Sequence, residues 1–87
     1  MKEIFLLTVK NPNAQEKLVK TAFSDLHDAL DKYREVYTNC TKMGYAGTDN
    51  TIISDKSYVK VAKLTTSNPA DTVRLRLENV TLVENNR

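Results

Sequence analysis

The chain has 87 residues, a formal net charge of +2, and apolar and charged fractions of 40% and 28%, which excludes an intrinsically disordered chain and fits one globular domain over residues 1–87. The net charge is too small to identify a partner by itself. No stretch approaches the roughly 18 consecutive apolar residues of a transmembrane helix, so we expect no membrane partner.

The first predicted element is a strand over residues 3–10, EIFLLTVK, which has apolar side chains on both faces. Phe5, Leu7 and Val9 share one parity. Because successive side chains of a strand point to opposite sides, Ile4 and Leu6 lie on the other side. Both faces of this strand therefore require cover from another layer.

A turn and a second strand are expected next. The segment NPNAQ favours a turn, because Pro and Asn both favour turns. Val19, Thr21 and Phe23 alternate within residues 16–23, which favours a strand that forms a hairpin with the first. The alternative is a short helix over residues 12–20, with Asn11 as its N-cap and Pro12 at its first position. Such a helix would cover the second face of the sheet.

The clearest predicted element is a helix over residues 25–43. Ser24 is the expected N-cap, and Gly44 is expected to end the helix in a left-handed conformation. Apolar residues recur at spacings of three and four, as in an amphipathic helix with one apolar stripe. The stripe consists of Leu26, Ala29, Leu30, Tyr33, Val36, Tyr37, Cys40 and Met43.

Two more strands are expected after the helix. GYAGTDN predicts a loop, and residues 57–65 and 72–77 predict two strands joined by the turn TSNPAD; TIIS is compatible with an additional short strand. Along the last strand Val73, Leu75 and Leu77 share one parity, whereas Val80 takes the other. A β-bulge would produce this change, and so would a tight turn that ends one strand and starts another.

This order of elements predicts the fold class. Runs of strands with one helix are typical of α+β domains. We expect a small two-layer sandwich in which an antiparallel sheet of about four strands, in the order ββαββ, carries one long amphipathic helix on one face. A further short strand is consistent with the same arrangement.

Residues that carry catalysis or bind metals are sparse. The single histidine and cysteine, His27 and Cys40, lie thirteen residues apart on the predicted helix, too far for a catalytic pair. With no second His or Cys, we expect no zinc site, no cofactor and no enzymatic activity. The lone cysteine cannot form an internal disulfide, and the sequence has no secretory signature, so we expect a cytoplasmic location.

The strongest expectation concerns one surface. A single helix covers one face of the sheet, which leaves Ile4 and Leu6 exposed on the other. Tyr58 and Ala62 are expected to extend this apolar patch, with Lys60 and the two arginines of the last strand around it. Such a patch typically marks an interaction site. The predicted partner-binding residues are Ile4, Leu6, Tyr58, Lys60, Arg74 and Arg76.

Two functions follow from this surface. The first is a small cytoplasmic accessory or inhibitor-type protein that binds through a protein interface, either as a homodimer or with a heterologous protein partner. In size and style the chain is similar to accessory proteins of bacteriophages and mobile elements, a likeness that rests on no motif. The alternative is a nucleic-acid-binding module, in which basic side chains beside an aromatic hold a single strand on the sheet.

Overall fold

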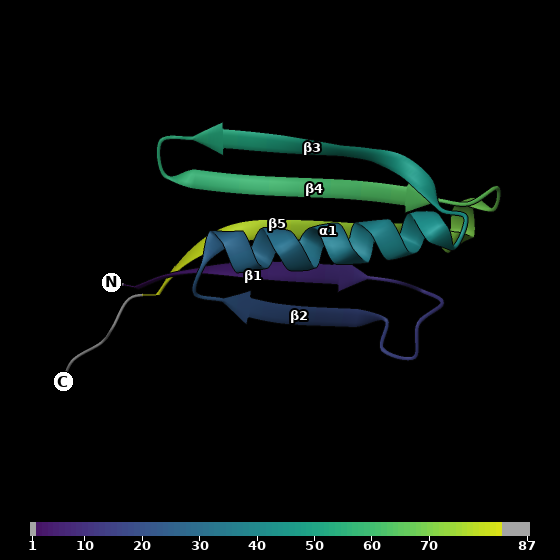
Figure 1. Cartoon of the computed structure of the whole chain (residues 1–87), viewed down its shortest axis with the longest axis horizontal. Helices are drawn as coiled ribbons and strands as arrows, with labels where there is room; N and C mark the ends of the chain where they lie inside the picture. The colour runs from purple at the N-terminus through teal and green to yellow at the C-terminus, as the bar shows by residue number, and fades with distance from the viewer. Residues whose placement is uncertain (1, 83–87) are drawn as a thin grey trace.

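The computed structural model describes residues 2–82 and confirms the predicted α+β class, with one α-helix and an antiparallel sheet. The strand order across the sheet is β2-β1-β5-β4-β3. Helix α1 runs along the strands over β1 and β5, and the β3–β4 hairpin lies beside it (Figure 1). The elements are β1 (Lys2–Lys10), β2 (Leu18–Phe23), α1 (Leu26–Lys42), β3 (Ala46–Ser54), β4 (Ser57–Thr65), the 3-10 helix η1 (Pro69–Asp71) and β5 (Val73–Leu82).

The sheet has five strands, one more than the expected four or so. Residues 46–50, expected to form a loop, are the first half of β3, which pairs with β4 along its whole length. Gly, Asp and Asn disfavour strands, and β3 is an exposed edge strand with no buried face to impose alternation. Gly47 is required here, because a Cβ atom at this position would overlap the carbonyl oxygen of Lys63 on β4.

The segment before the helix confirms the strand rather than the short helix. Residues 18–23 form β2, which pairs antiparallel with β1. Residues 12–17 form turns, closed by a hydrogen bond of 2.9 Å from the Asn11 amide to the Lys17 carbonyl. Within residues 2–82, no second α-helix therefore covers the other face of the sheet. We call that uncovered side the open face.

The ends of α1 follow local capping rules. The N-cap is Asp25 rather than Ser24, and its carboxylate accepts a hydrogen bond of 3.0 Å from the His27 amide. At the other end Gly44 adopts the predicted left-handed conformation, with φ of 95°. Met43 was wrongly assigned to the apolar stripe: it lies beyond the last helical residue and is 72% exposed.

The core lies between α1 and the facing side of the sheet. Tyr33 is the largest fully buried side chain, and it projects from the middle of the helix. Alternate residues of three central strands meet it and its neighbours, which is the period-2 pattern of a half-buried sheet. The buried strand residues are Leu7, Ala62, Leu64, Val73, Leu75 and Leu77.

Strand β5 contains neither a bulge nor a turn, so both explanations of its change in parity were wrong. Its register with β1 is unbroken from the pair Lys10–Arg74 to the pair Ile4–Val80 and beyond. Asn79 occupies the helix side, where its side chain accepts a hydrogen bond from the Tyr58 amide at 2.8 Å. The apolar residues change parity because Val80 belongs to a second apolar surface, on the open face.

Candidate functional site

The six residues predicted to bind a partner do not share one face. Leu7 and Leu77 are register partners and both face α1, so the alternate residues of β1 and β5 face the opposite way. The structure therefore places Ile4, Leu6, Arg74 and Arg76 on the open face.

Tyr58 and Lys60 were wrongly expected on that face. Lys60 is the register partner of buried Leu77, which places it on the helix side. Tyr58 packs against the core, as does Ala62, which is 5% exposed. Apolar residues occupy both parities of β4, so alternation alone does not reveal which set faces the helix.

Lys60 is held on the helix side by specific contacts. Its amino group lies 5.3 Å from the centre of the Tyr33 ring, 3.2 Å from the Asp49 carboxylate and 3.2 Å from the Thr51 hydroxyl. A cation above an aromatic ring, paired with a carboxylate, is a stable arrangement for a largely buried lysine. Burial, and next the nearby Asp49 carboxylate, raise the pKa of the Tyr33 phenol above its ordinary range. Lys60 therefore contributes to the core and not to the open face.

The open face divides into two parts along the strands. The part nearer the start of β1 is apolar (Figure 1 shows the strand directions). Its side chains come from all five strands, and the central ones are half-buried by their neighbours although no layer covers them. We call this part the apolar half; it consists of Ile4, Leu6, Ala22, Ile52, Val59 and Val80.

The part nearer the end of β1 is basic. Arg74 lies in a row between Lys10 on β1 and Lys63 on β4, and Arg76 and Lys20 belong to the next row. We call these five residues the basic half. Lys63 was missed in the sequence because Lys60 was placed outward, and Lys10 and Lys20 were missed because strand register alone brings them to this part of the face. Lys63 has the opposite parity, so the correct phase of β4 brings it beside Arg74.

Glu78 lies inside the apolar half, between Leu6 and Val59, and next to Arg76 of the basic half. Its carboxylate lies 2.6 Å from the Arg76 side chain, two residues along β5, and the glutamate side chain is 29% exposed. Glu78 pairs across the sheet with Leu6 on one side and Val59 on the other. Arg76 is therefore partly neutralised, whereas no carboxylate among residues 2–82 pairs with Lys10, Lys63 or Arg74.

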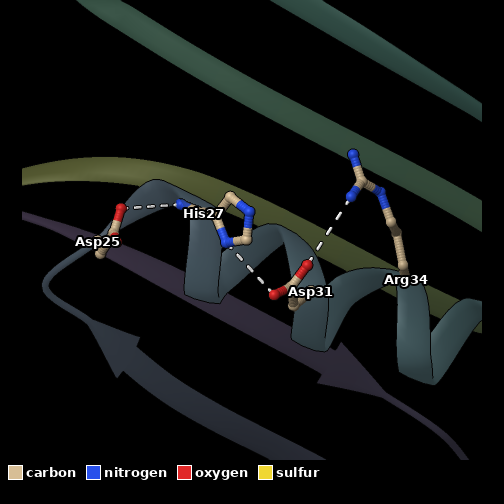
Figure 2. A network of polar contacts seen from close by, with 4 residues as sticks. All are labelled: Asp25, His27, Asp31 and Arg34. Atoms are coloured by element: carbon tan, nitrogen blue, oxygen red, sulfur yellow. Dashed lines mark hydrogen bonds and ion pairs between the residues drawn. The ribbon is translucent and has the colours of Figure 1, made fainter.

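The first turns of α1 carry a polar network on the side away from the sheet (Figure 2). Asp31 lies 3.3 Å from the His27 ring and 3.8 Å from the Arg34 guanidinium. One ligand atom each from His27, Asp28 and Asp31 fit within 4.8 Å of one another, but all three side chains are exposed. Clusters of this kind support a helix N-terminus electrostatically, and we assign no metal site to it.

Cys40 and His27 both lie on α1, as expected, and are separated by roughly 20 Å of helix. Cys40 is buried, and burial raises the pKa of its thiol. A buried thiol that keeps its proton is a poor nucleophile and metal ligand. Its role is to fill the apolar stripe of the helix.

Comparisons with protein-family models, curated proteins and solved structures find no match to this chain. Among residues 2–82 no helix is long and apolar enough to cross a membrane.

Proposed function

We propose that this protein is a small, non-enzymatic accessory or inhibitor-type module that binds a protein partner through the apolar half of its open face. The observation that carries the proposal is the uncovered cluster of Ile4, Leu6, Val59 and Val80 at the centre of a sheet. Uncovered apolar side chains gathered on one surface of a small domain are typical of an interaction site, and here they surround one charged residue, Glu78. The buried Cys40 thiol, which has no second thiol in the chain, is consistent with action in the reducing cytoplasm.

A second copy of the chain is the partner that we propose first, because two-fold homodimers are the commonest soluble assemblies. Stacking two whole open faces with their strands aligned would place the unpaired cations of Lys10, Lys63 and Arg74 against their own copies. A two-fold axis perpendicular to the strands and through the apolar half avoids this repulsion. It superposes only the apolar halves and leaves the basic halves at opposite ends of the dimer.

The test compares self-association of the wild type with that of Leu6→Asp, by sedimentation equilibrium over a range of concentrations up to millimolar. Leu6→Asp places a charge in the apolar half and should shift the population to monomer, with an unchanged circular dichroism spectrum. The matched control is Ile53→Asp, because Ile53 is 72% exposed and lies on the helix side of edge strand β3. The control should associate as the wild type does. A wild type that stays monomeric throughout would contradict the homodimer.

A further inference from the structure

The basic half concentrates charge that the chain as a whole does not have. Its five cations, together with the Glu78 carboxylate that pairs with Arg76, give a local charge of five minus one, or +4, within a chain of net charge +2. Lys10, Arg74 and Lys63 lie side by side on adjacent strands, which are about 4.7–4.9 Å apart in a sheet. Holding three like charges in one row is unfavourable unless an anion neutralises them.

A groove runs through this half of the face. It has a volume of about 490 Å³ and is lined by Lys10, Lys63, Arg74 and Arg76, with the side chains of Thr48 and Asn50 among its polar lining. Asp49 also borders it, but its carboxylate is paired with Lys60 at 3.2 Å on the helix side. A second hollow of about 440 Å³ shares Lys10 and Arg74 and adds Lys17. The two hollows meet at Lys10 and Arg74, and the second reaches the turn residues Asn11, Pro12 and Pro69.

The composition of the face identifies the kind of anion. Binding of a single strand depends on stacking bases on aromatic rings. The described strand residues of the open face include no aromatic side chain, because Phe5, Phe23 and Tyr58 all pack on the helix side. A duplex keeps its own base stacking and presents a dense array of phosphates, about one charge per 1.7 Å. Lys, Arg, Thr and Asn are side chains that contact such phosphates.

We propose that the basic half binds the phosphate backbone of a nucleic acid duplex, without reading its sequence. Arg74 is the central contact, and Lys10 and Lys63 flank it on either side. Thr48 and Asn50 supply uncharged donors at the edge of the groove. This binding rests on the charges of the basic half and does not depend on the apolar half or on dimerisation.

The test is fluorescence anisotropy with a short labelled DNA duplex, titrated at several salt concentrations. With four or five phosphates contacted, log K should fall against log salt with a slope of about −4. Arg74→Glu should weaken binding by at least about tenfold and Arg74→Gln should reduce the slope by about 1. The matched control is Arg34→Glu, which makes the same charge change on the exposed outer side of α1 and should leave affinity within about twofold of the wild type.

Three results would overturn the proposal. The first is equal weakening by Arg34→Glu and Arg74→Glu, which would mean that only net charge matters. The second is tighter binding of the matched single strand than of the duplex. The third is displacement of the duplex by poly-glutamate at equal charge concentration, which would indicate that the ligand of the basic half is an acidic protein. Arg74→Glu should still self-associate, so failure of this proposal is distinguishable from failure of the protein interface.

Discussion

The amino group of Lys60 lies over the ring of Tyr33, 5.3 Å from its centre. Lys60 shares the helix side with the buried Ala62 and Leu64, and because successive strand residues alternate, the odd-numbered residues of β4 lie on the open face. Val59 therefore joins the apolar half, and Lys63 the basic half. The facing of β4 thus decides the composition of the open face.

The hydroxyl of Tyr33 provides a test of the core. It is buried and has no hydrogen-bond partner among the described residues, a state that costs about 1–3 kcal/mol. Tyr33→Phe removes the hydroxyl and keeps the ring beneath Lys60, so the free energy of unfolding should rise by about 1 kcal/mol. Tyr33→Ala should lower it by about 3–5 kcal/mol. Urea denaturation measures both changes.

Tyr37 is the control for this prediction. Its ring stacks on Tyr33 with centroids 6.4 Å apart, but its hydroxyl donates a hydrogen bond of 3.3 Å to the Gly47 carbonyl. Tyr37→Phe should therefore lower stability slightly, which is the opposite sign. A loss of stability in Tyr33→Phe as well would show that the Tyr33 hydroxyl has a partner and would contradict the description of the core.

Asn79 should stabilise the sheet through its side-chain amide. The amide accepts from the Tyr58 backbone at 2.8 Å and donates to the Lys56 carbonyl at 3.0 Å, which joins β5 to the β3–β4 hairpin. Asn79→Val places an apolar residue on the helix side of β5, as at Val73, Leu75 and Leu77, but removes both of these hydrogen bonds. We expect a loss of about 1–3 kcal/mol in the free energy of unfolding. Thermal and urea unfolding should agree on the sign.

Thr81→Ala is the matched substitution for Asn79→Val. Thr81 has the same parity on β5 and an exposed side chain, so its substitution should change the free energy of unfolding by no more than about 0.5 kcal/mol. If Asn79→Val were as stable as the wild type, the two hydrogen bonds of the Asn79 side chain would contribute nothing to stability, and the structural role given to Asn79 would be wrong.

Stability should fall in alkaline solution. Burial raises the pKa of the Cys40 thiol and of the Tyr33 phenol above their ordinary values of 9.0 and 10.0. Above those values the unfolded chain releases protons that the folded chain retains, so the free energy of unfolding decreases as pH rises. The stability from these two groups is fully present below about pH 8 and declines through pH 9 and 10.

Tyr33→Phe separates the two contributions to this decline. The variant keeps Cys40 but has no buried phenol, so its free energy of unfolding should decline less steeply above pH 10 than that of the wild type. Urea denaturation at a series of pH values provides the measurement. Identical slopes for the two proteins would mean that Tyr33 ionises as freely in the folded state as in the unfolded chain.

Local patterns were sufficient for much of the fold. The helix was predictable because its apolar stripe, its acidic first turn and Gly44 are all encoded within a few residues. The facing of Arg74 and Arg76 was also predictable, since Val73, Leu75 and Leu77 alternate strictly with charged residues. These features depend on residues that are close together in the sequence, so the spacing of apolar and charged residues is sufficient to predict them.

Features that depend on pairing between distant strands were not predictable. The β4 sequence is apolar on both parities, and Lys60 lies on the helix side with the buried Ala62 and Leu64, where Asp49 and Tyr33 contact its amino group. The first half of β3 has the composition of a loop, but it forms a strand because its backbone pairs with that of β4. The basic half was consequently missed, since Lys10 and Lys63 meet Arg74 only through register.

Self-association through the apolar half is best examined by an isotope-filtered NOE experiment on a mixture of labelled and unlabelled wild-type protein at high concentration. We predict intermolecular NOEs from the Leu6 methyl groups to the methyl groups of Val59 and Val80, and none to Arg74. Intermolecular NOEs confined to the exposed edge residue Ile53, or none at all in a protein that sediments as a monomer, would contradict the account.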